Sequence, residues 1–380
     1  MTLAATAPPS PVESRAFGLD VARLLACSLV LLAHCTAVFV PMFGGRVPVF
    51  VVLSAYWGVE LFFVLSGFLI GRLLFQIAET DPTPRGWLIF MVRRWMRTLP
   101  LYWLWLIVLP LTLPLPPHFG MRLLMFVTMT QNLAWPMPRD EWFNASWSLT
   151  IEEWFYLLFS IALIGAVALT RSRRSIWAVI ALFLIVPPLL RLQYTDVSDF
   201  EHQIYHVVVL RLDAIAYGVA LARLRIRGSA LFRHPRVAFV LGIAIIAALW
   251  VQAADGVWLP LSGAHYMGLQ LIAGALGLCL FLTGIAGLRT RLRPLAWVVG
   301  MGSRLSYGIY IMHLSIIEAV SWYAVDHNKT RLFIPLVSAP LTVLLPYVSY
   351  RLFEAPIMAL RPRQRRPAPA IDASWAAGRT

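Results

Sequence analysis

Charged residues are scarce in this sequence. Asp, Glu, Lys and Arg together make up 13% of the 380 residues, whereas a soluble globular domain has about 25%. Hydrophobic residues account for 59% of the chain, and its mean hydropathy is +0.73. Such a chain has too little polar surface for a soluble fold. The composition therefore predicts an all-α integral membrane protein that crosses the bilayer many times.

Lysine and cysteine are rarer still. Lys329 is the only lysine, so the net charge of +14 comes almost entirely from arginine. In a membrane protein such an excess indicates cytoplasmic loops rather than a nucleic-acid partner. Cys27, Cys35 and Cys279 lie within apolar runs and in no metal-binding spacing. We therefore expect three free buried thiols that form no metal site. We also expect no tightly bound cofactor.

Long apolar runs, by contrast, are abundant. Ten of them are long enough to cross a bilayer as helices, because about 20 apolar residues span the hydrocarbon core. We expect these spans near residues 17–40, 49–75, 99–116, 147–169, 176–192, 204–222, 237–254, 266–287, 296–325 and 332–353.

The distribution of arginine predicts the orientation of these spans. The loops after even-numbered spans are rich in arginine, as in residues 171–174 and 223–236, whereas the alternate loops are poorer in arginine and often acidic. Because positive loops stay in the cytoplasm, we expect both termini there. One membrane domain, residues 15–360, then lies between an Ala/Pro-rich tail (1–14) and a basic tail (361–380), both expected to be disordered.

The first apolar run contains three ionisable residues, Asp20, Arg23 and His34. Eleven residues of helix return to within about 20° of the same face, roughly 16 Å further along, so Arg23 and His34 share one stripe. Ionisable groups inside a membrane helix indicate function unless they pair or snorkel. The alternative is that Arg23 snorkels beside Asp20 and that His34 only packs.

Further charges fall inside other spans. Glu60 lies in the second span and needs a partner there, and Arg211 and Asp213 in the sixth span are expected to form a second buried charge couple. Glu152 and Glu153 begin the fourth span beside Trp147, which favours a sugar-facing or proton-handling site over a simple helix N-terminal charge.

Two further groups of residues are candidates for binding. Arg93, Arg94 and Arg97 lie on one arc of an expected short interfacial helix, residues 87–100. Such a cluster suits either lipid headgroups or the phosphates of a cosubstrate. Tyr310 and His313 lie mostly on one side of the ninth span.

Together these residues resemble the acyltransferase family 3 membrane proteins, bacterial enzymes that O-acylate surface glycans and some antibiotics. The resemblance covers nearly the whole chain, with Glu60 where the family often has Asp. It rests on the order and spacing of Leu19-Asp20, Arg23, His34, Gly58–Phe68, Arg93-Arg94, Trp147–Leu149, Glu152, Phe155-Tyr156, Arg211, Asp213, Ser306-Tyr307, Tyr310, His313 and Glu354–Pro356.

The resemblance implies transfer of an acyl group, usually acetyl, from cytosolic acyl-CoA to a carbohydrate-containing acceptor at the bacterial cytoplasmic membrane. It also implies that His34 is the key catalytic residue. A neutral imidazole takes a proton from a hydroxyl or carries the acyl group itself, and we expect Arg23 to position the donor and Glu152 to lie near the acceptor.

Other functions stay open from the sequence. The acceptor is a polysaccharide, a lipopolysaccharide, a glycolipid or a small glycosylated metabolite. A transporter or flippase of glycan precursors would predict inverted repeats with broken helices, which the sequence does not show. A glycan-binding protein without activity would not need a histidine linked to cytosolic arginines through one helix.

Overall fold

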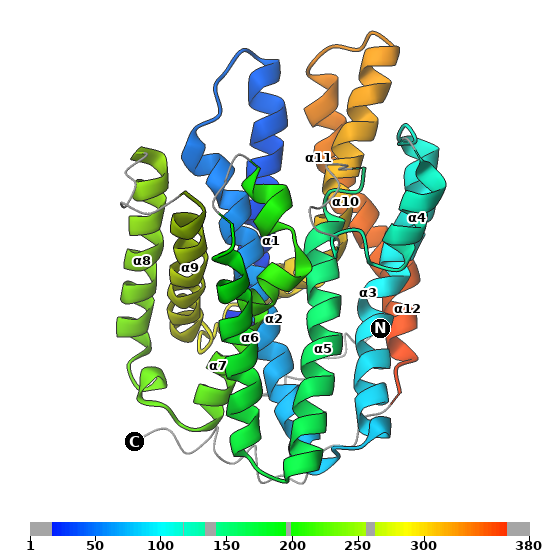
Figure 1. The fold of residues 1–380 in the computed structure, drawn as a ribbon. Helices are drawn as coiled ribbons and strands as arrows, with labels where there is room; N and C mark the ends of the chain where they lie inside the picture. Colours follow the sequence, from blue (N-terminus) through cyan, green and yellow to red (C-terminus); the bar gives the residue numbers. More distant parts are fainter. Residues whose placement is uncertain (1–16, 117, 134–141, 195–198, 256–262, 363–380) are drawn as a thin grey trace, which may run out of the picture.

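The computed structural model describes residues 17–116, 118–133, 142–194, 199–255 and 263–362. This part of the chain is mostly helical and contains no β-strand, which confirms the all-α class (Figure 1). The helices are α1 (Phe17–Met42), α2 (Val49–Thr80), α3 (Pro84–Thr112), α4 (Phe119–Val127), α5 (Ser146–Thr170), α6 (Arg174–Arg191), η2 (Glu201–Tyr205), α7 (Val208–Ile226), η3 (Ala230–Phe232), α8 (Pro235–Asp255), α9 (Gly263–Ile285), α10 (Arg293–Asp326), α11 (Phe333–Ser349), η4 (Tyr350–Glu354) and α12 (Ala355–Ala359).

Eight helical segments in the described part are long and apolar enough to cross a membrane. They correspond to eight of the ten expected spans. The other two expected spans fall on α3 and α7, and α7 carries several charged residues, among them Arg211 and Asp213. The number of ten and the cytoplasmic placement of both termini stay predictions.

The centre of the bundle is formed by α1, α2 and α7, with α10 against α1 (Figure 1). Helices α2 and α7 approach closely at two glycines. A Cβ atom on Gly67 would overlap the carbonyl oxygen of Ile215, and one on Gly218 would overlap that of Val64. Small residues at such crossings let two backbones pack directly.

The prediction of a separate, short interfacial helix at residues 87–100 is wrong. These residues and the apolar run after them form one continuous helix, α3, which passes through Pro100. A proline removes one backbone hydrogen bond and favours a break. Here Leu101 and Tyr102, which follow it, are fully buried, and the Tyr102 hydroxyl donates to the carbonyl oxygen of Phe126. Packing of the residues that follow the proline therefore helps to keep the helix intact.

The three cysteines are unpaired, as expected from their spacing. Cys27 and Cys279 are buried, whereas Cys35 is only partly so. Their surroundings are helical and apolar, so they act as small packing residues.

Candidate functional site

Two histidines from distant parts of the chain meet between α1 and α10. The Nδ1 atom of His34 lies 2.8 Å from the Nε2 atom of His313. On the far side of its ring, the His313 Nδ1 atom lies 2.8 Å from the carbonyl oxygen of Tyr310 and 3.1 Å from that of Ile309. Both predicted candidates, His34 and His313, therefore belong to one hydrogen-bonded pair.

The carbonyl contacts fix the tautomers of this pair. A carbonyl oxygen only accepts, so the proton of a neutral His313 ring is on Nδ1, and its Nε2 atom accepts. It follows that His34 donates from Nδ1 to His313. The Nε2 atom of His34 is then unprotonated and has no hydrogen-bond partner among the described residues. It is free to take a proton or to act as a nucleophile.

The pair lies on a cavity of about 360 Å³, which we call the His34 cavity. Its wall combines aromatic rings with a few polar side chains, and the described lining contains no lysine or arginine. Trp147 is part of it and stacks on His206, with ring centroids 4.1 Å apart. The aromatic and polar side chains of this wall are Tyr56, Trp57, Asn144, Trp147, Phe200, Glu201, Tyr205, His206, Gln270 and Tyr310.

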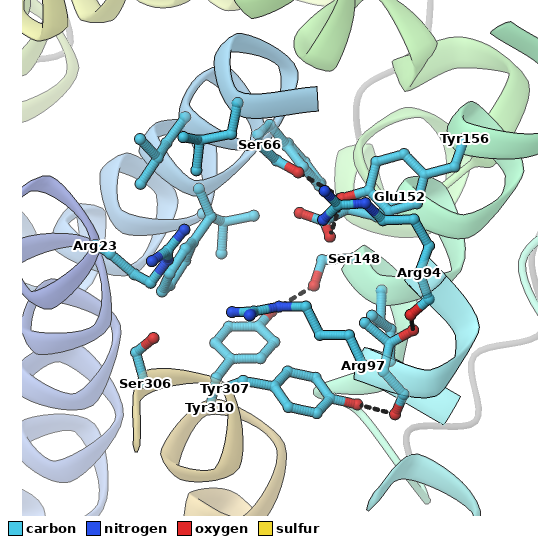
Figure 2. A pocket seen from close by; sticks show the side chains of 17 residues that line it. Arg23, Ser66, Arg94, Arg97, Ser148, Glu152, Tyr156, Ser306, Tyr307 and Tyr310 are labelled. Atoms are coloured by element: carbon cyan, nitrogen blue, oxygen red, sulfur yellow. Dashed lines mark hydrogen bonds between the residues drawn. The ribbon is translucent and has the colours of Figure 1, made fainter. Parts of the chain in front are cut away.

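A second cavity of about 340 Å³ has the opposite character; we call it the arginine cavity. Arg23 enters it from α1, and Arg94 and Arg97 enter it from α3 (Figure 2). Glu152 from α5 is the one carboxylate among its lining residues. Three guanidinium groups against one carboxylate leave a surplus of positive charge, which favours an anionic ligand.

Arg23 is held in place by its own helix and by α10. Its Nη1 atom donates to the Ser303 hydroxyl at 3.0 Å, and that hydroxyl donates to Oδ1 of Asp20 at 2.6 Å. The direct Arg23–Asp20 contact is longer, at 3.8 Å. The expected Asp20–Arg23 association is therefore present, but a serine bridges it.

Glu152 lies in the arginine cavity and not in the His34 cavity (Figure 2). The Tyr156 hydroxyl donates to its Oε2 atom at 2.8 Å, and Ser66 lies 2.5 Å from the same hydroxyl. The sequence placed Glu152 beside the acceptor, together with His34. The structure places it in the cavity that Arg23 also lines, and its predicted position near the acceptor stays a prediction.

Tyr310 lies on the boundary between the two cavities and lines both. Its hydroxyl lies 2.6 Å from the Ser148 hydroxyl, as Figure 2 shows. Val59 also lines both cavities. Arg23 and His34, which were predicted to lie on one stripe of α1, thus line two neighbouring cavities. Tyr310 and Val59 lie between these cavities.

Arg93 does not share the arginine cavity with Arg94. Its Nη1 atom donates to the carbonyl oxygen of Pro362 at 2.6 Å. Adjacent helical residues point about 100° apart, whereas residues three apart share a face. For this reason Arg94 and Arg97 line the cavity together and Arg93 does not, while the predicted role of Arg93 and Arg94 in binding stays a prediction.

The buried charges near α7 pair differently from the expectation. Arg211 forms an ion pair with Glu60, and both side chains are almost fully buried. Asp213 pairs with Arg191 of α6, at 2.7 Å. The predicted Arg211–Asp213 couple is therefore wrong, because residues two apart on a helix face away from each other. None of these four residues lines either cavity.

Glu153, the neighbour of Glu152, faces another direction. The Thr98 hydroxyl donates to its Oε1 atom at 2.6 Å, and the residue is buried. It lines a separate hollow of about 210 Å³ beside Trp95, Trp103 and Trp154. Adjacent positions on α5 thus place the two glutamates in different environments.

Several contributing residues escaped the sequence reasoning. Ser303 gave no signal, because serines in apolar helices usually serve packing. Arg191 at the end of an apolar span and His206 near the start of another were detectable as buried ionisable residues.

Comparison with known families gives a match over nearly the whole chain. The family model described as acyltransferase domain, Acyl_transf_3, matches residues 17–351. Neither the curated proteins nor the solved structures give a significant match. The matched range contains both cavities and the histidine pair. The chain therefore belongs to acyltransferase family 3.

Proposed function

We propose that the protein is an O-acyltransferase that moves an acyl group, most simply acetyl, from acyl-CoA to a hydroxyl group of a carbohydrate-containing acceptor. The observation that carries this proposal is the His34–His313 pair, whose hydrogen bonds leave the Nε2 atom of His34 unprotonated beside a cavity. The fold supplies two cavities of different character, which suits two different substrates.

The donor is assigned to the arginine cavity. Acyl-CoA carries several phosphate groups, and guanidinium groups bind phosphate oxygens with two parallel hydrogen bonds. Arg94 and Arg97 on α3 offer such groups, and Arg23 extends the positive lining into the bundle. The pantetheine arm would run from these arginines towards Tyr310 and present the thioester to His34.

The acceptor is assigned to the His34 cavity. Its tyrosine and tryptophan rings offer flat apolar faces for a sugar ring, and its amide, carboxylate and imidazole groups offer hydrogen bonds to hydroxyls. A polysaccharide, lipopolysaccharide or glycolipid terminus suits this wall, as does a small glycosylated metabolite.

The chemistry follows from the free Nε2 atom of His34. It removes the proton of the acceptor hydroxyl as the oxygen attacks the thioester carbonyl, and it returns this proton to the departing CoA thiolate. In the alternative route Nε2 attacks the thioester first and CoA leaves as its thiolate; the acceptor hydroxyl then displaces the imidazole, and its proton neutralises the thiolate. In both routes His313 accepts from Nδ1–H and stabilises the positive charge that develops on His34.

We also propose that the protein lies in the bacterial cytoplasmic membrane with both termini in the cytosol, because arginine-rich loops alternate with acidic ones. Reporter fusions to the C-terminus test the topology. A C-terminus on the outer side of the membrane would contradict it and would move the donor to the wrong compartment.

The deciding experiment measures transfer of label from acetyl-CoA in membranes containing the wild-type protein, His34→Ala or His327→Ala. His327 is an exposed histidine just after α10, away from both cavities, and serves as the matched control. We expect His34→Ala to lose about 10²–10⁴-fold in turnover and His327→Ala to keep it. A folded His34→Ala protein with wild-type turnover would overturn the proposal.

A further inference from the structure

Four arginines gather where α12 and the residues just after it pack on α3. Arg93, Arg94 and Arg97 come from α3 itself, and Arg361 follows α12, which lies against α3 (Figure 1). Arg93 holds this segment in place through its hydrogen bond to the carbonyl oxygen of Pro362. Arg361 lies outside residues 17–351, the range that matches the family.

No carboxylate among the described residues pairs with the guanidinium group of Arg361. Its Nε and Nη2 atoms are buried, and no described residue accepts a hydrogen bond from them. Burial and the positive charges of Arg97, Arg94 and Arg93 lower the pKa of Arg361 to about 10. Because this value is well above 7, the group stays charged at neutral pH.

The neighbouring arginines also lack carboxylate partners among the described residues. In the described part of the chain, none of the four guanidinium groups forms an ion pair with a carboxylate. Within the described residues the cluster is therefore short of negative charge, which favours an anionic ligand.

We propose that Arg361 binds a phosphate group of the acyl-CoA donor together with Arg94 and Arg97. This assignment rests on the proposed function, because Arg94 and Arg97 line the arginine cavity. Nε and Nη2 form one edge of the guanidinium group, and this edge matches two oxygens of one phosphate. A segment outside the family match thus completes the donor site.

A phospholipid headgroup carries the same phosphate chemistry, so the experiment has to separate the two sources. The donor is favoured because the cluster continues into a cavity that leads towards Tyr310 and the histidine pair. A lipid headgroup would need only the outer part of the cluster.

The test measures the affinity of purified full-length protein for acetyl-CoA and for S-acetylpantetheine, which has the thioester but no diphosphate and no ribose phosphate. The variants are Arg361→Ala, Arg361→Lys and, as the control, Arg351→Ala, which removes an exposed arginine from η4. We expect Arg361→Ala to weaken acetyl-CoA binding by about 10–100-fold, the range of a charge-assisted hydrogen bond. Arg361→Lys should lie between it and the wild type, and Arg351→Ala should match the wild type.

Binding of S-acetylpantetheine should be equal in all variants. Equal acetyl-CoA affinity of Arg361→Ala and wild type would overturn the inference, as would an equal loss for both ligands, which would indicate a structural role. A third arm compares melting temperatures in phosphatidylglycerol and phosphatidylcholine micelles. If Arg361→Ala lost only a stabilisation by phosphatidylglycerol, the ligand would be a lipid and the inference would be wrong. Failure of wild-type protein to bind acetyl-CoA would instead remove the proposed function and this assignment with it.

Discussion

The Nδ1 atom of His34 and the Nε2 atom of His313 lie within 2.8 Å of each other, although 279 positions separate the two residues. The carbonyl oxygens of Ile309 and Tyr310 hold the His313 proton on Nδ1 and so direct the His34 lone pair, on Nε2, away from its partner. We therefore expect His313 to act by positioning His34 and not by contacting the substrate.

His313→Ala should lower turnover by about 10²-fold, near the lower end of the range for losing a base. The KM for acetyl-CoA should change little, because His313 lies outside the arginine cavity. His313→Gln keeps a hydrogen-bond acceptor near Nδ1 of His34 and should recover part of the rate. Steady-state kinetics on both variants check this, and a raised KM with unchanged kcat would speak against a positioning role.

Arg94→Ala and Arg93→Ala should differ, although the residues are adjacent. Arg94 lines the arginine cavity and Arg93 is tied to the Pro362 carbonyl. We expect the KM for acetyl-CoA to rise by about 10–100-fold in Arg94→Ala and by much less in Arg93→Ala. Equal effects of the two substitutions would contradict the assignment of the donor to the arginine cavity, which only Arg94 of the two lines.

Glu60→Ala should destabilise the protein by about 3–5 kcal/mol, because it leaves the guanidinium group of Arg211 buried without a partner. Asp326→Ala removes an exposed carboxylate at the end of α10 and is the control. Thermal unfolding in detergent measures both. A double variant, Glu60→Leu with Arg211→Leu, should regain stability, and its failure to do so would point to a role beyond pairing.

Tyr310→Phe and Ser148→Ala remove the same hydrogen bond from its two ends. Their effects on unfolding free energy should therefore not add, and the coupling should be about 1 kcal/mol. A double-mutant cycle measures it. Additive effects would mean that the two hydroxyls do not hold the boundary between the cavities together.

The sequence alone determined the class of the fold and much of the candidate site. Low charge and long apolar runs leave few structures other than membrane helices, because only these satisfy their backbone hydrogen bonds in lipid. The helical period placed Arg23 and His34 on one face of α1. Spacing within a single helix is local, so these expectations needed no knowledge of neighbours.

Only the tertiary structure decided which charged groups meet. Arg211 pairs with Glu60 of α2 and not with Asp213, and Glu152 lines the cavity of Arg23 rather than that of His34. Local spacing gives the direction of a side chain from its own helix but not the helix that it faces. That choice is made by packing, as at Gly67, where α2 and α7 come close enough for Glu60 and Arg211 to pair.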